Sequence, residues 1–102
     1  MFDGTLSTVL DGEGNGEIRL AFPGQSVTIY RLTVATSPAT REVLCSVFRN
    51  FVGPPYLVDN TYTGGTGDTS DTSHSLKDGS ALLVRWEGGD PGARATVTYS
   101  GE

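Results

Sequence analysis

Alternation of apolar and polar residues is the feature that most limits what this chain can fold into. From Ala93 to Tyr99 every second residue is apolar, and in residues 81–87 one face collects Leu82, Val84 and Trp86. A period of two is that of a β-strand with one buried side. No stretch of ten or more residues shows a sustained helical period. The sequence therefore predicts an all-β protein.

The segment between these two runs has the residues of a turn. In Gly88-Gly89-Asp90-Pro91-Gly92 the proline fixes φ and the glycines accept positive φ. We therefore expect residues 81–87 and 93–99 to pair as a β-hairpin. The expected cross-strand neighbours are Trp86 with Ala95, Val84 with Val97 and Glu87 with Arg94.

Further strands are expected at residues 16–22, 25–36, 42–50 and 56–62. Within the second of these, the apolar pattern changes register, which predicts a bulge near Tyr30-Arg31. Residues 42–50 are partly apolar on both faces, which predicts a central strand or one covered on both sides. About seven or eight short antiparallel strands are typical of a β-sandwich, such as a jelly roll.

The length of 102 residues fits one domain. Residues 1–10 are expected to form an extended N-terminal arm or an edge strand, and residues 11–102 the single sandwich domain. Residues 63–75 are rich in Gly, Thr, Ser and Asp, which predicts one long polar loop. Loops of that length are uncommon unless they are functional or ordered by a partner.

Charge and targeting signals narrow the function classes. The net charge is −5, and Lys77 is the single lysine, so nucleic acid and anionic membranes are not expected partners. The sequence shows no signal-peptide pattern and no apolar run of bilayer length. These features favour a soluble protein made in a cytoplasm. A single cysteine excludes an intramolecular disulfide.

No catalytic set of residues is predicted. His74 is the one histidine, and its polar neighbours predict a solvated loop residue. Cys45 lies between Val43 and Val47 on an apolar face, where a cysteine acts as a small buried hydrophobe. The expectation is therefore a protein that is not an enzyme.

No metal or cofactor site is predicted either. Residues 11–17 place oxygen-bearing side chains at alternate positions, as a Ca²⁺ loop does, but the twelfth position is Phe22 and the flanks resemble strands. A glycine-rich turn is favoured there, and Ca²⁺ binding stays open. Residues 64–69 lack the lysine of a phosphate-binding loop. Tyr56 and Tyr62 flank irregular segments, which keeps a small carbohydrate-binding module as an alternative.

The segment from Leu82 to Thr98, LLVRWEGGDPGARATVT, resembles the C-terminal end of small virion proteins from tailed phages of actinobacteria. Residues 14–20, 59–64 and 67–71 are also similar to segments of that group, so the likeness covers roughly residues 12 to 100. It includes no catalytic residue. The resemblance implies a structural or accessory protein of the virion.

A capsid decoration protein on the outside of the head shell is the function that the resemblance and the small size favour, with a minor tail protein as the alternative. Such a protein is made in the host cytoplasm and ends on the virion exterior. Its expected partners are the major capsid protein and further copies of itself, as a trimer. The expected contact residues, in the N-terminal segment and the polar loop, are Phe2, Leu6, Val9, Asp68 and Asp71.

Overall fold

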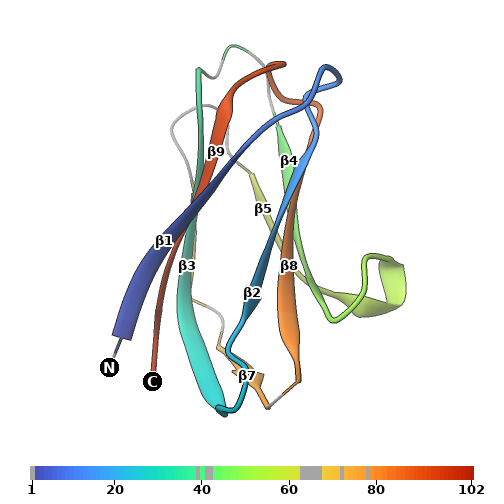
Figure 1. Ribbon diagram of the computed structural model, residues 1–102. Helices are drawn as coiled ribbons and strands as arrows, with labels where there is room; N and C mark the ends of the chain where they lie inside the picture. Colours follow the sequence, from blue (N-terminus) through green and yellow to red (C-terminus); the bar gives the residue numbers. More distant parts are fainter. Residues whose placement is uncertain (1, 39, 41–42, 63–67, 72, 78) are drawn as a thin grey trace.

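Two antiparallel β-sheets pack face to face in the computed structural model, which describes residues 2–38, 40, 43–62, 68–71, 73–77 and 79–102 (Figure 1). The five-stranded sheet contains β1 (Phe2–Val9), β9 (Arg94–Gly101), β3 (Val27–Ser37), β6 (Asp68–Ser70) and β7 (His74–Leu76). The four-stranded sheet contains β2 (Gly16–Ala21), β8 (Ala81–Glu87), β4 (Leu44–Arg49) and β5 (Leu57–Tyr62). A single 3₁₀ turn, η1 (Pro54–Tyr56), precedes β5. The predicted all-β sandwich is confirmed.

The strand pairings are nested, like those of one long ribbon folded back on itself. Both β6 and β7 pair with β3, so they replace a single interrupted strand. The nested pairs are β1 with β9, β2 with β8, β3 with β6 and β7, and β4 with β5. Pairing of β3 with β9 and of β4 with β8 then rolls the ribbon into two sheets. This is the jelly-roll arrangement.

The predicted hairpin of residues 81–87 and 93–99 is wrong. The two strands lie in opposite sheets, because β8 pairs with β2 and β4 whereas β9 pairs with β1 and β3. The expected neighbours Trp86–Ala95, Val84–Val97 and Glu87–Arg94 therefore do not pair. Glu87 instead forms an ion pair with Arg85 at 2.8 Å. Alternation correctly identified the inward-facing side chains, but it does not say which sheet a strand joins.

The core lies between the sheets and is built from the alternating inward residues of both. Trp86 is its largest fully buried side chain, and Cys45 is also fully buried, as expected. The predicted bulge in β3 is confirmed by a register shift between Ile29 and Arg31. The central position predicted for β4 is confirmed as well, because β4 lies between β8 and β5.

A clasp between two glycine-rich loops closes one end of the sandwich. The loop of residues 10–15 joins β1 to β2, and the loop of residues 88–93 joins β8 to β9. Leu10 N donates to Ala93 O (2.8 Å), Gly92 N to Leu10 O (3.0 Å) and Gly89 N to Gly14 O (3.0 Å). Gly14 has a φ of 78°, and a Cβ there would lie 1.9 Å from Gly89 O. We call these two loops the loop clasp.

Three aromatic rings close the other end. Phe2, Phe22 and Tyr99 meet edge to face, with ring centroids 5.3 to 6.1 Å apart. Such contacts add roughly 0.5–1.5 kcal/mol per pair beyond the burial of apolar area. Phe2 thereby holds the start of β1 against the core.

The prediction of one continuous polar loop at residues 63–75 is wrong where the structure describes it. β6 and β7 are short strands that pair with β3 through Leu32–Ser70 and Ile29–His74, among others. Residues 63–67 and 72 lie outside the described part. Strands of only three residues, Asp68–Ser70 and His74–Leu76, leave almost no periodic signal, because their pairing is fixed by a distant partner.

Candidate interaction surface

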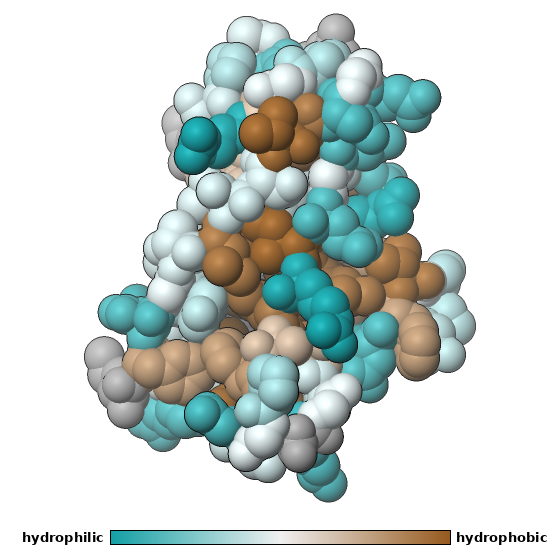
Figure 2. All heavy atoms as spheres, viewed as in Figure 1, coloured by the Kyte–Doolittle hydropathy of each residue, from teal (hydrophilic) through white to brown (hydrophobic). Residues whose placement is uncertain are grey.

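The connection between β4 and β5, together with the first residue of β5, carries a cluster of four exposed apolar side chains. Phe51 is 61 % exposed, Tyr56 44 %, Val52 42 % and Leu57 39 %. We call these four residues the apolar tip. The connection stands out from the four-stranded sheet on the side away from the other sheet (Figure 1), and brown, apolar surface lies at the same place in Figure 2. Clustered exposed apolar residues mark interaction sites more often than scattered ones do.

Local structure holds the apolar tip in a defined shape. The prolines of η1 restrict the backbone, and Tyr56 N donates to Gly53 O at 2.9 Å. The rings of Phe51 and Tyr56 lie 5.2 Å apart at an interplanar angle of 57°. Because the rings contact each other, part of the ordering cost of a binding surface is already met.

An apolar row on the outer face of the four-stranded sheet continues this surface. Phe48 pairs with Leu57 on one side and with Leu83 on the other. Strand alternation places Leu83 on the outer face, since Leu82 and Val84 point into the core, but Leu83 is itself only 8 % exposed. Arg19 of β2 is the cross-strand neighbour of Leu83 and begins the charged border of this apolar row. An apolar centre with a polar rim is the usual anatomy of a protein interface.

Sequence reasoning missed most of this surface and identified only Tyr56, as a candidate exposed ring. Phe51, Val52 and Leu57 were not selected, because a short apolar run is equally compatible with burial. The available signal was a stretch without charge, residues 50–58, interrupted by Gly53-Pro54-Pro55. A Gly-Pro-Pro turn interrupts a strand, so the apolar residues just before it, Phe51 and Val52, are expected in a loop.

The predicted contact residues of the N-terminal segment lie on β1, at the edge of the five-stranded sheet. Phe2 packs against the core, and Leu6 shares its face but is 40 % exposed. Val9 lies on the opposite face and is 62 % exposed. Two of the three side chains are therefore accessible to a partner.

The two predicted aspartates lie at the other edge of the same sheet. Asp71 forms an exposed ion pair with Arg31, with Nε and Oδ1 2.7 Å apart. The backbone of Asp68 begins β6, and its side chain lies outside the description. Since β1 and β6 are separated by β9 and β3, the predicted contact residues do not form one surface.

The expectation of a solvated His74 is wrong. Its side chain is 3 % exposed on β7, and Nε2 has no hydrogen-bond partner among the described residues. Burial lowers the pKa of His74, Asp59 opposes that shift, and Arg49 adds to it. Ser70 Oγ donates to the Asp59 carboxylate across the two sheets. This hydrogen bond links the two sheets, since Ser70 lies on β6 and Asp59 on β5.

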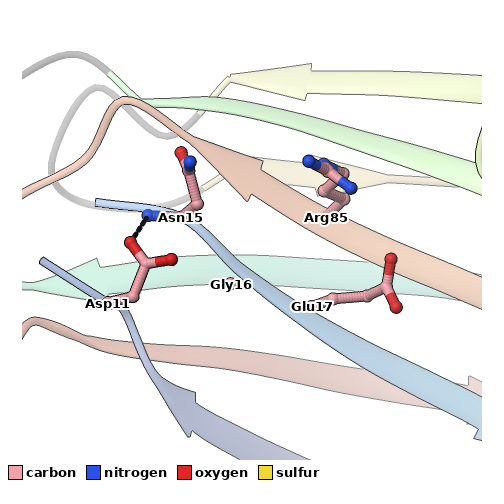
Figure 3. A pocket seen from close by; sticks show the side chains of 5 residues that line it. All are labelled: Asp11, Asn15, Gly16, Glu17 and Arg85. Carbon is pink, nitrogen blue, oxygen red and sulfur yellow. Dashed lines mark hydrogen bonds between the residues drawn. The ribbon is translucent and has the colours of Figure 1, made fainter. Parts of the chain in front are cut away.

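A shallow pocket of about 230 Å³ lies beside residues 11–17 (Figure 3). Asp11 Oδ1 accepts hydrogen bonds from the backbone N–H groups of Glu13 (2.8 Å) and Asn15 (3.0 Å). These hydrogen bonds lower the pKa of Asp11, and the bond from Asn15 has the largest effect. The carboxylate therefore stabilises the turn, as the glycine-rich turn interpretation expects.

No metal site emerges from the part of the chain that the structure describes, since no three His, Cys, Asp or Glu side chains gather there. None of the described helices is long and apolar enough to cross a bilayer. Comparisons with protein-family models, with curated proteins and with solved structures find no match.

Proposed function

We propose that this protein is a structural component of a tailed-phage virion, a decoration protein on the outside of the head shell that acts by binding. Its partners are the major capsid protein and further copies of itself. The apolar tip is the observation that carries the proposal. Four large apolar side chains exposed within seven residues, on a rigid turn, suit attachment to another protein.

Two further observations support this function. The sequence around Trp86 and the loop clasp resembles small virion proteins of actinobacterial phages. The jelly roll is a fold of viral capsid domains, although lectins share it, so the fold is an argument by analogy. A shell presents many identical sites, and such repetition multiplies modest affinities.

A carbohydrate-binding module is the second candidate, and the exposed ring pair of Phe51 and Tyr56 favours it. A sugar site also needs a few polar groups placed beside the rings. The neighbours here are Val52 and Leu57, which are apolar and exposed. The surroundings of the rings therefore favour a protein surface over a glycan.

Co-sedimentation with empty head shells tests the proposal. Leu57→Ser removes an apolar side chain that is 39 % exposed at the tip, and Leu44→Ser removes the same side chain, 38 % exposed, at the other end of the outer face. We expect Leu57→Ser to weaken shell binding about 3- to 8-fold, because full burial of a leucine contributes roughly 1.5–3 kcal/mol and the 39 % of Leu57 that is still exposed corresponds to about 0.6–1.2 kcal/mol of that. We expect Leu44→Ser to bind as the unaltered protein does.

Three results would contradict the proposal. Equal shell binding by both variants would show that the apolar tip is not the contact. Binding to isolated tails but not to heads would make the protein a minor tail component. Binding on a glycan array that Tyr56→Ser abolishes, without any binding to shells, would establish the carbohydrate alternative.

A further inference from the structure

The edges of the two sheets differ in how they are protected. An edge strand has backbone N–H and C=O groups without a ladder partner, so it can pair with a strand of another molecule. Natural proteins prevent this with short strands, bulges, charged residues or inward-pointing charges. In the described structure the edges are β1 and the β6–β7 line in one sheet, and β2 and β5 in the other.

Three of these edges have such protection. β6 and β7 contain only three residues each. β5 has an irregular register where it pairs with Val47 and Phe48, and it turns Asp59 inward to Ser70 of the opposite sheet. β2 exposes the charges of Glu17 and Arg19.

β1 has none of these features along most of its length. Its register with β9 is unbroken over eight residues, from Phe2–Gly101 to Val9–Arg94. From Gly4 to Val9 it contains no charge and no proline. Leu6 is 40 % exposed on the inner face, because no described strand lies beyond β1 to cover it.

We propose that β1 pairs with β1 of a second copy, antiparallel and about a two-fold axis, so that the two five-stranded sheets become continuous. A second copy of this chain is the favoured partner for β1, because β1 of that copy is the one edge in its described part that lacks protection. The inference rests on the proposed function, since it identifies how copies of the decoration protein contact each other.

The charge on β1 determines the direction of pairing. Asp3 is its single charged residue and lies near one end. Antiparallel pairing centred on Leu6 places the two Asp3 residues six positions apart, about 20 Å at strand spacing. That exceeds the screening length of about 8 Å at physiological ionic strength, whereas parallel pairing in register would bring them together. The same centre places the two half-exposed leucines opposite each other.

A matched pair of variants tests this pairing. Thr5 and Thr98 are cross-strand neighbours on one face, both are exposed, and their hydroxyl oxygens lie 3.3 Å apart. Thr5→Lys and Thr98→Lys therefore remove the same hydrogen bond and add the same charge. Only Thr5→Lys puts the charge on the edge strand.

The mass in solution is measured by light scattering from about 1 to 200 µM, a range that brackets the micromolar affinity of small interfaces. We expect the unaltered protein and Thr98→Lys to become dimers, with slower deuterium exchange of β1 amides at high concentration, and Thr5→Lys to stay a monomer over the whole range. Circular dichroism checks that all three are folded.

Other outcomes would overturn the inference. Dimers of Thr5→Lys, or monomers of Thr98→Lys, would show that the edge of β1 is not the contact. A trimer would exclude two-fold pairing. An unaltered protein that stays monomeric but sediments with shells would refute strand pairing and leave the proposed function intact. Dimers that ignore shells would refute the function and leave the pairing intact.

Discussion

Gly14 is the position at which a single methyl group should do most damage to the loop clasp. Its φ of 78° disfavours any L side chain by roughly 1–2 kcal/mol. In Gly14→Ala the new Cβ would lie 1.9 Å from Gly89 O, about 1 Å inside the closest approach that real Cβ atoms show. The loop of residues 88–93 would have to retreat, and the bond from Gly89 N to Gly14 O would be lost.

The loop of residues 88–93 has little room to move away, because Gly89 is itself tightly packed. A Cβ on Gly89 would lie 2.8 Å from Leu10 Cδ1. Overpacking of this kind costs about 1–3 kcal/mol, and a lost hydrogen bond about 1 kcal/mol. With the backbone cost, the free energy of unfolding of Gly14→Ala should fall by roughly 3 to 6 kcal/mol.

Gly92→Ala is the matched control. Gly92 has the same φ of 78°, but a Cβ there would meet nothing within 4 Å. The free energy of unfolding of Gly92→Ala should therefore fall by the backbone cost alone, about 1–2 kcal/mol. Urea unfolding followed by the fluorescence of Trp86, the only tryptophan, measures both variants. Equal losses for the two glycines would refute the claim that the close approach to Gly89 holds the clasp.

Three further predictions concern single side chains. His74→Gln should make stability less sensitive to acid. Because burial lowers the pKa of His74, the unfolded chain takes up a proton on this residue below about pH 6.5 and the folded chain does not, so acid favours unfolding. Between pH 7.5 and 5.5 the melting temperature of the unaltered protein should therefore fall by more than that of the variant, and equal falls would contradict this. Cys45 should not react with a thiol reagent in the native protein and should react fully in denaturant, whereas rapid native reaction would mean that the core opens. Asp71→Asn should change the free energy of unfolding by less than about 0.5 kcal/mol, since its ion pair with Arg31 is exposed, and a larger loss by urea unfolding would refute that view.

Sequence alone predicted the class of fold and the direction of many side chains. The alternation at Leu82, Val84 and Trp86 and the register change in β3 reflect burial, and burial depends on residue type. The hairpin at residues 88–92 was mispredicted because a strand that crosses between sheets buries the same face as one that turns back. Hydrogen bonds to Leu10 and Gly14, about eighty residues away, decide between the two.

The candidate surface was predicted less well than the fold. Val9 and Leu6 were expected to be contacts from their place in an N-terminal segment, and their exposure follows from the edge position of β1. The apolar tip was overlooked, because exposure of Phe51 depends on where the β4–β5 connection projects. His74 was misplaced for a similar reason, since the polar residues beside it give no sign of its burial.

The nested pairings also favour one order of folding. β4 and β5 are the only described strands that pair with their immediate neighbour in sequence, whereas the residues paired between β1 and β9 are 85 (Val9–Arg94) to 99 (Phe2–Gly101) positions apart. Closing a long loop before its contacts form is entropically costly, so such topologies fold slowly, in milliseconds to seconds. We expect the chain to start at the β4–β5 hairpin and zip outward. During synthesis β1 therefore leaves the ribosome before the other strands of the sandwich and acquires its partner last.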